Sequence, residues 1–543
     1  MVPARRLAGV AVMVILAMLL ACRGEPAPLP PGDPSRPDIV LVSIDTLRAD
    51  HLSCYGHDRP TSPFIDRLAE AGTRFAQARS PSPWTLPAHT TLMSGQLVAT
   101  HRVIDDAYSL SPDTPVLAES LRAGGYRTGG FVSTLYVSSL FGFQRGFDRF
   151  EDFGIHSEKQ NLSGSLTFDR VIDEALDWWR TQPAGQPVFL FLHTYDVHYE
   201  YDPPEPYASM FDRAPRRGDP HYKNYFYFKK HPLTAEQLEH QRAQYDEAIR
   251  WVDDQLARLD EHLAASGRRV RWVVTADHGE EFGERGSWGH AHTLYAEQLH
   301  IPLVIAERGG DSLPAGKVVV DPVGLQDVAP TIAGWVEKAA PLQPDGIDLS
   351  PVMGGQPAPT RAFTAQTSRF ETNRVGLFAD GLRLEWDLKA NRVELFDLDD
   401  DPTESRDLSR RRPADVARLQ RALVEALGSP WRARRAGTVS SRKSGRVLTV
   451  DDRGVRAGVR SAVTAGQAFQ VLPYDAPLWF SGKDGAGAGG VQGPWKALGG
   501  ALPGADAPVE YQPSLGGPRD VALDDATREA LEALGYMQEE PGP

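Results

Sequence analysis

The sequence predicts an α/β fold in which a parallel sheet is covered by helices on both faces. Short apolar runs rich in β-branched residues indicate buried strands. Segments with helical periodicity lie between these runs. The chain has 543 residues, which is too long for one hydrophobic core, because single cores stop growing near ~250–300 residues. We therefore expect one large α/β domain followed by smaller parts.

The predicted strands are continuous apolar runs. The first, Ile39 to Ile44, reads Ile-Val-Leu-Val-Ser-Ile and is typical of a strand that is buried on both faces. The other strands are expected at residues 129–133, 188–192, 270–275 and 302–305.

Helix signals separate these strands. Pro63 fits the first turn of a helix that Ser62 can cap and Gly72 ends. The clearest helix begins at Thr234, which forms a capping box with Gln237. Helices are expected at residues 62–72, 114–125, 167–179 and 234–265.

A smaller region follows the α/β domain. Residues 382–386 and 393–396 look like a hairpin and residues 413–427 have a helical pattern, so we expect a C-terminal α+β subdomain. Beyond it the composition shifts to Gly, Ala, Ser and Pro, which predicts no particular fold. The expected organisation is a signal peptide over 1–21, a Pro-rich tether over 22–37, a catalytic domain over 38–335, the subdomain over 336–430 and an extension of unknown fold over 431–543.

The N-terminus reads as an export signal. Arg5 and Arg6 precede the uncharged apolar run Leu7 to Ala21, which is short for a bilayer span of ~20 residues. The run ends at Cys22 in a sequence that resembles a bacterial lipoprotein box, and this implies a lipidated Cys22 as the mature N-terminus. An ordinary secretory signal is the alternative. We expect a protein that is lipid-anchored in the bacterial cell envelope, with Cys54 as its remaining thiol.

Composition excludes several functional classes. With 58 basic and 72 acidic residues the net charge is −14, which argues against a nucleic-acid partner because a general nucleic-acid binder needs a basic surface. The two cysteines are too few for a disulfide scaffold or a cysteine-based zinc cluster.

Polar residues follow the predicted strands at the edge where open α/β sheets place their ligand sites. Asp45 follows the first strand, His198 lies shortly after a second one, and Asp277 and His278 follow a third. Thr85 lies just before a predicted helix, whose N-terminus favours anions. Two carboxylates and an imidazole suit a divalent transition metal, and a hydroxyl on that metal can become a nucleophile near neutral pH.

Each of these residues also has a simpler structural explanation. An Asp after a strand is more often a helix cap or a turn residue, Asp277 could form an Asx turn with the residues after it, and Thr85 could be an N-cap. His290 and His292 could be solvated loop residues. Their joint occurrence favours a metal-dependent ester site, in which the remaining histidines hold the anion or protonate a leaving group.

These segments together resemble the sulfatase family, within the alkaline phosphatase superfamily, over about residues 37–335 and in patches to about 430. The resemblance implies a mixed, mostly parallel sheet sandwiched by helices, with a smaller C-terminal α+β subdomain. The segments that carry it, in family order, are Pro37–Asp50, Thr61–Ala69, Trp84–His89 with Ser94 and Gly95, Thr275–Glu280, Gly289–Tyr295 leading to Ile301–Leu303, and Glu394–Pro402.

The resemblance also implies roles for single residues. Asp45, Asp277 and His278 would hold the metal, and the Thr85 hydroxyl would lie on it as the nucleophile. His198 would contact the ester oxygens. His292, with or without His290, would lie at the oxyanion or the leaving group.

Two departures from the family pattern shape the functional prediction. Family sulfatases carry Cys or Ser, followed by x-Pro-x-Arg, at the position of Thr85 and oxidise it to formylglycine. Oxidised threonine would instead give a ketone. His89 stands where the Arg is expected, and we expect His89 to supply a positive or proton-donating contact there. Thr46 stands where many sulfatases have a second Asp, which weakens a calcium site. We expect one divalent metal ion, with zinc or manganese favoured and calcium or magnesium still open.

The leading hypothesis is a metal-dependent phosphoester hydrolase or phosphotransferase that uses Thr85 on an anionic phosphate or sulfate ester. A sulfatase that acts without formylglycine is the first alternative. It ranks below the phosphoester enzyme because a simple alkoxide attacks sulfate esters less readily than phosphate esters. A catalytically inactive surface binding lipoprotein is the second. Residues 199–232 hold many aromatic side chains and suggest either a loop over the site or a packed surface excursion.

Overall fold

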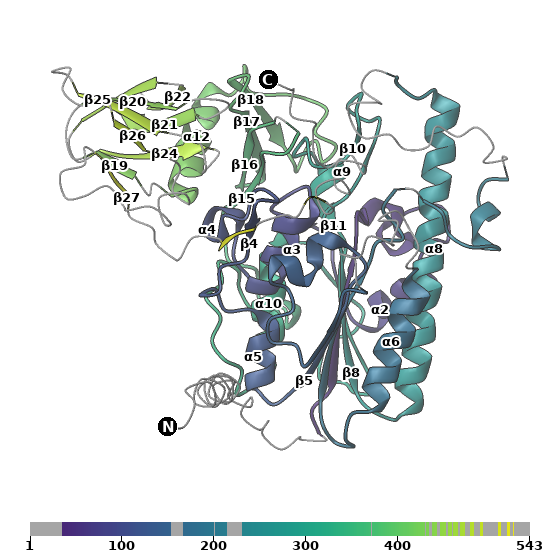
Figure 1. Cartoon of the computed structure of the whole chain (residues 1–543). Helices are drawn as coiled ribbons and strands as arrows, with labels where there is room; N and C mark the ends of the chain where they lie inside the picture. Colours follow the sequence, from purple (N-terminus) through teal and green to yellow (C-terminus); the bar gives the residue numbers. More distant parts are fainter. Residues whose placement is uncertain are drawn as a thin grey trace, which may run out of the picture.

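A computed structural model describes residues 35–153, 167–199, 201–213, 231–370 and 372–428, and short stretches between 431 and 525 (Figure 1). The expected signal peptide, Cys22 and most of the tether lie outside the described residues. Among the helices that are described, none is both long enough and apolar enough to cross a membrane.

A mixed, mostly parallel sheet of eight strands forms the centre of the large domain, which confirms the predicted fold class. β12 is antiparallel to both of its neighbours, whereas the other pairs are parallel. β1 is buried along its whole length, as its apolar run predicts. In spatial order the strands are β13 (Lys317–Val319), β2 (Thr73–Phe75), β12 (Leu303–Arg308), β8 (Val270–Thr275), β1 (Asp38–Ile44), β7 (Val188–Thr194), β5 (Arg127–Phe131) and β6 (Arg149–Glu151).

Helices cover both faces of this sheet (Figure 1). One face carries α2 (Pro63–Ala71), α6 (Phe168–Arg180) and α8 (Ala235–Ala265). The other carries α3 (Thr85–Ser94), α5 (Leu117–Ala123) and α10 (Val328–Gly334). The short helices are α4 (Val98–His101), α9 (Ala296–Leu299) and α11 (Ser350–Met353), and the 3-10 turns η1 (Ala49–His51) and η2 (Ser53–Tyr55) follow β1.

Most local signals behave as the sequence predicts, with small shifts. Ser62 stands at the N-cap position of α2 but does not cap it: its hydroxyl donates to Oδ1 of Asp66 at 2.9 Å, and the Asp253 carboxylate accepts from the Phe64 and Ile65 N–H groups instead.

The capping box of α8 is present. The backbone N–H of Gln237 donates to the Thr234 hydroxyl, and the backbone N–H of Thr234 donates to the side-chain oxygen of Gln237. The helix expected from Thr114 begins at Leu117 instead. There the Glu119 carboxylate accepts from the Val116 N–H at 3.3 Å and thereby caps the later start.

The predicted C-terminal α+β subdomain is an antiparallel sheet with one helix. Its strands are β15 (Phe363–Thr367), β16 (Arg374–Ala379), β17 (Leu382–Asp387) and β18 (Arg392–Asp397), and its helix is α12 (Pro413–Ala426). The expected hairpin is β17–β18, in whose turn Asn391 adopts a φ of 52°.

The region beyond residue 430, for which the sequence predicts no fold, contains strands in two sheets. One sheet has the order β22-β21-β24-β19-β27 and the other β23-β20-β25-β26. Their bounds are β19 (Trp431–Ala433), β20 (Gly437–Ser441), β21 (Arg446–Asp451), β22 (Gly454–Gly458), β23 (Arg460–Val463), β24 (Ala468–Leu472), β25 (Leu478–Gly482), β26 (Gly489–Val491) and β27 (Val509–Tyr511).

Small strand pairs complete the fold. β28 (Arg519–Asp520) returns from the C-terminal region and pairs with β4 (Tyr108–Ser109) of the large domain. β11 (His300–Ile301), β3 (Ala78–Arg79) and β14 (Val323–Gly324) form a three-stranded sheet. β9 (Glu281–Phe282) and β10 (Trp288–Gly289) form a hairpin directly after the end of β8.

Candidate active site

Three neighbouring parallel strands deliver polar side chains to one edge of the sheet. Ser43 of β1 is paired with Thr275 of β8 on one side and with His193 of β7 on the other. Asp45 and Asp277 each lie two residues beyond this register and are fully buried. The carboxyl ends of parallel strands therefore meet here, as open α/β sheets predict.

Asp45, Asp277 and His278 form a compact group. Their potential ligand atoms all lie within 4.8 Å of one another. Nε2 of His278 is 3.3 Å from Oδ2 of Asp277 and 3.8 Å from Oδ1 of Asp45. Because Nδ1 of His278 donates to the Gly279 carbonyl at 2.9 Å, a neutral ring presents Nε2 as a lone pair toward the carboxylates.

The donor set of this group fits a divalent metal. Oδ1 of Asp45 and Oδ2 of Asp277 are buried and have no hydrogen-bond partner among the described residues. Burial raises the pKa of Asp45 to about 7, and the neighbouring His278 offsets only part of that effect. Unpaired buried carboxylates are costly, and a cation held between them would remove that cost. The mixture of two oxygens and one imidazole nitrogen suits zinc or manganese.

Thr85 begins α3 with its hydroxyl at this group. Its Oγ1 is 3.5 Å from Oδ2 of Asp45 and 3.5 Å from Nε2 of His278. Trp84 occupies the N-cap position, and among the described residues the contacts of the Thr85 hydroxyl go to Asp45 and His278. The hydroxyl is therefore directed at the buried cluster and not at the helix end.

His89 lies one turn further along α3 and is completely buried. Its Nδ1 donates to the Thr85 carbonyl and its Nε2 accepts from the Ser43 hydroxyl, both at 2.9 Å. Nδ1 is also 3.5 Å from Oδ2 of Asp277. Burial lowers the pKa of His89 to about 3, so its ring is neutral and connects α3 to β1 beneath the cluster.

His198 and His290 lie next to each other, and His290 also lies beside the metal group. The ring centroid of His290 is 4.6 Å from that of His278 and 4.9 Å from that of His198. His198 is held between Tyr195 and Tyr199, donates from Nδ1 to the Tyr199 carbonyl and accepts from the Tyr195 hydroxyl. Burial lowers the pKa of His198 well below its usual value.

His292 is held in a different hydrogen-bond network. Its Nδ1 donates to the His290 carbonyl at 2.8 Å, and its Nε2 lies 2.8 Å from the Ser287 hydroxyl and 3.2 Å from Oε2 of Glu281. Both ring nitrogens are therefore engaged within the hairpin region. Of the two histidines, His290 is the one in ring contact with the metal group.

Two nearby residues received no role from the sequence. Nε2 of His193 is 3.3 Å from Oδ2 of Asp45, and burial lowers the pKa of His193 to about 4. The sequence signal for a role of His193 was its position, because it lies at the end of the strand that is next to the strand of Asp45. Glu280 is fully buried and its Oε1 is 2.9 Å from Nδ1 of His290.

Thr46 takes no part in the cluster through its side chain. Its backbone is left-handed, with a φ of 58°, and its N–H donates to Oδ1 of Asp277 at 3.2 Å. Its hydroxyl donates instead to the Val197 carbonyl at 2.9 Å. Thr46, at the position where many sulfatases have a second Asp, thus orients the Asp277 carboxylate but adds no ligand of its own.

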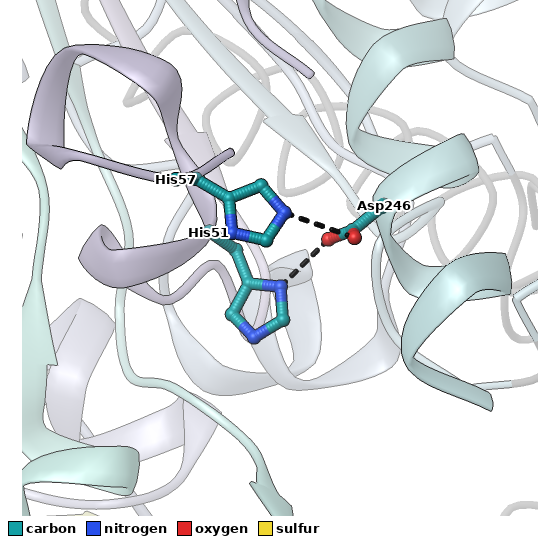
Figure 2. Close-up of side chains that lie close together, drawn as sticks. All are labelled: His51, His57 and Asp246. Atoms are coloured by element: carbon teal, nitrogen blue, oxygen red, sulfur yellow. Dashed lines mark hydrogen bonds and ion pairs between the residues drawn. The ribbon is translucent and has the colours of Figure 1, made fainter. Parts of the chain in front are cut away.

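A second group, His51, His57 and Asp246, has its side chains close together (Figure 2). Nδ1 of His51 is 2.6 Å from one Asp246 oxygen, and Nε2 of His57 is 3.0 Å from the other. Arg59 also donates to Asp246, at 2.7 Å. Both oxygens are occupied and a guanidinium already supplies positive charge, so this group fits a structural tie between the 51–59 segment and α8.

Part of the aromatic stretch covers this edge. Tyr199 and Tyr201 are buried, and the Tyr201 hydroxyl donates to Oε2 of Glu280 at 3.2 Å. Tyr207 packs on Trp251 of α8. Residues 200 and 214–230 of this stretch lie outside the described residues.

Comparison with known proteins gives one consistent family. The family model described as Sulfatase matches residues 37–338. An arylsulfatase of Clostridium perfringens is 20% identical over 431 residues, which cover 68% of this chain and 89% of that protein. The multifunctional alkaline phosphatase superfamily protein PehA of Trinickia caryophylli is 24% identical over 416 residues, which cover 60% and 79%.

The solved structures agree on the fold. The crystal structure of the phosphonate monoester hydrolase of Agrobacterium radiobacter matches with a TM-score of 0.58 and 20% sequence identity. The match covers 78% of this chain and 100% of that one.

Proposed function

The chain belongs to the sulfatase family, and we propose that it cleaves an anionic phosphate-type ester with the Thr85 hydroxyl as its nucleophile. The observation that carries the proposal is the position of Oγ1 of Thr85, 3.5 Å from both Asp45 and His278. Family sulfatases need an aldehyde at this position, which a threonine side chain does not yield on oxidation. An unmodified alkoxide attacks phosphorus more readily than sulfur, so a phosphoester is the better substrate.

The residues of the cluster have separate tasks in this reaction. Asp45, Asp277 and His278 would hold one divalent ion, which supplies Lewis-acid stabilisation of charge on the ester and favours an ionised hydroxyl beside it. Oγ1 of Thr85 forms the new bond to phosphorus as the bond to the leaving oxygen breaks. With Nε2 of His278 on the ion, Oδ2 of Asp45 would remain as the acceptor for the Thr85 hydroxyl proton, 3.5 Å from Oγ1, and the leaving oxygen would take up a proton in turn.

The second half-reaction removes the phosphoryl group from Thr85. Water as the acceptor gives a hydrolase, and a second alcohol gives a phosphotransferase. His290 lies beside this group, where an imidazole nitrogen can contact the oxygens of the bound anion, and His198 packs against His290 with both of its own ring nitrogens bonded to Tyr195 and Tyr199. Nδ1 of His89 donates to the Thr85 carbonyl and so holds the first turn of α3 in place.

Paired assays test the proposal against its alternatives. Wild type and Thr85→Ala are assayed with bis(4-nitrophenyl) phosphate and with 4-nitrophenyl sulfate at equal concentrations. We expect faster cleavage of the phosphodiester, and loss of that cleavage in Thr85→Ala. Preference for the sulfate would favour a sulfatase that acts without formylglycine, which the arylsulfatase relative makes the second candidate. Absence of both activities in metal-loaded protein would favour a binding protein.

We also propose that the protein is lipid-anchored through Cys22 in a bacterial cell envelope. The support is the Arg5-Arg6 start, the apolar run to Ala21 and the lipoprotein-like box.

A further inference from the structure

The β9–β10 hairpin places a buried carboxyl group behind His290. Gly289 of β10 pairs with Glu281 of β9, so the next residues outward, His290 and Glu280, lie across from each other at the open end of the hairpin. Oε1 of Glu280 is 2.9 Å from Nδ1 of His290. Oε2 of Glu280 accepts from the Tyr201 hydroxyl at 3.2 Å. Both carboxyl oxygens are therefore fixed by partners, and the whole side chain is buried.

This contact determines which edge of the imidazole is available. Nδ1 of His290 is taken by Glu280, and within the described part of the chain Nε2 has no hydrogen-bond partner. The ring lies 4.6 Å from His278 and 4.9 Å from His198, measured between centroids. Nε2 is thus the nitrogen left for a ligand that binds at the metal group.

The adjacent pair in the hairpin is built differently. His292 and Glu281 also contact each other, at 3.2 Å, but Nε2 of His292 is the nitrogen used and Nδ1 is bonded to the His290 carbonyl. Ala291 separates the two histidines with a left-handed φ of 72°. The chain therefore carries two Glu–His pairs side by side, and only the first leaves a ring nitrogen for substrate.

We propose that Glu280 is a positioning residue, which holds His290 so that Nε2 faces the ester bound at the metal group. The inference rests on the proposed function. The contact with Glu280 engages Nδ1 and fixes the plane of the ring, so Nε2 is the nitrogen that faces the metal group. Glu280 therefore fixes the direction of the His290 side chain, and a ring held in place meets the ester oxygens without first having to reorient.

A double-mutant cycle tests whether Glu280 acts through His290. The four proteins are wild type, Glu280→Ala, His290→Ala and the double variant, each assayed with bis(4-nitrophenyl) phosphate. We expect Glu280→Ala to lower kcat/KM by about 10- to 100-fold in the wild-type background. In the His290→Ala background the same change should have almost no effect, because the residue that it positions is gone.

Glu281→Ala, made in both backgrounds, is the matched control. It removes the neighbouring carboxylate, which holds His292. Any fold-loss in kcat/KM that it causes should be the same with and without His290. Thermal melting and metal content of all variants check that they are folded and loaded. Tyr201→Phe is the milder variant, since it removes only the second bond to Glu280, and its smaller loss should also vanish without His290.

The inference is overturned if Glu280→Ala keeps wild-type kcat/KM, or if it costs the same factor in the His290→Ala background. Failure of the proposed function looks different, because wild type itself would then fail to cleave the phosphodiester.

Discussion

Thr85 is the residue on which the proposed chemistry depends. Replacing it with alanine should lower kcat/KM by about 10³-fold or more, because the attacking oxygen is lost. The free energy of unfolding should change by no more than about 1 kcal/mol, the cost of losing a helix-terminal side chain. Thr85→Ser should keep part of the activity, since the hydroxyl survives. Kinetics and thermal melting of wild type, Thr85→Ala and Thr85→Ser test this prediction. An active Thr85→Ala protein with a lowered Tm would show that Thr85 has only a structural role.

The buried carboxylates make a second prediction at this scale. Wild type should bind one divalent ion per chain, and Asp277→Asn should bind none under the same dialysis, because Asp277 carries an unpartnered buried oxygen. Asp246→Asn is the matched control, since Asp246 is equally buried but already bonded to His51, His57 and Arg59. Elemental analysis measures both. Loss of the ion in Asp246→Asn, with retention in Asp277→Asn, would move the metal to the group of Figure 2.

At the scale of elements, the His51–His57–Asp246 group ties the segment after β1 to α8 and should respond to pH. Burial alone would lower the pKa of His57, but Asp246 reverses this effect, so the pKa lies above its usual value. Protonated His57 therefore stabilises the fold below about pH 6.5, and this contribution is lost as the pH rises through the folded-state pKa. Hydrogen bonds from the two histidines outweigh burial at Asp246 and hold its pKa far below that range, so Asp246 stays ionised throughout.

His57→Gln exposes this dependence. The difference in Tm between wild type and His57→Gln should be largest near pH 6 and should shrink above about pH 8. Differential scanning calorimetry across this range measures the difference. His57→Gln made in an Asp246→Asn background is the control and should show no such trend, because the partner that raises the pKa of His57 is gone, whereas a constant difference for His57→Gln in the wild-type background would contradict the ion pair.

Sequence patterns predicted the strands that end at Asp45 and Asp277, because a buried parallel strand is a local apolar run followed by a polar turn. They also placed Thr85 at a helix start. They did not predict that the His89 ring turns inward to Ser43, since that depends on how α3 packs on β1. They did not separate His290 from His292 either. That difference follows from the left-handed backbone at Ala291 and the hairpin register, for which the sequence carries no periodic signal.

At the scale of the whole molecule, the C-terminal region is joined to the domain that carries the site. The described strand β28 pairs with β4, and the Val521 N–H donates to the Ala107 carbonyl at 2.8 Å. The Asn373 side chain donates to the Leu472 carbonyl at 3.2 Å and joins the α+β subdomain to β24. Figure 1 shows these C-terminal sheets beside the β15–β18 sheet. The extension therefore contacts the large domain after leaving it, which its Gly- and Ala-rich composition did not predict.

The chain enters the fold at the edge of the sheet opposite the site. Arg36 bonds to the Gly124 carbonyl and Asp38 begins β1, whereas Asp45 follows its far end. Seven strand residues, at about 3.3 Å each, separate the two ends by roughly 23 Å. The described part of the chain therefore enters the sheet at the end of β1 away from the metal group, and removing an anchor at Cys22 should leave catalysis unchanged.

Cys22→Ser should accordingly release the protein from the membrane fraction, or leave it as an unprocessed precursor, while kcat/KM of the folded protein stays at the wild-type value. Fractionation followed by kinetics measures both effects. A single acyl chain anchors only marginally, so we expect more than one chain on the wild-type cysteine, which mass spectrometry of the N-terminal peptide can count. An unlipidated native N-terminus beyond Cys22 would disprove the anchor. A fall in kcat/KM on release would instead indicate that the site needs the membrane surface.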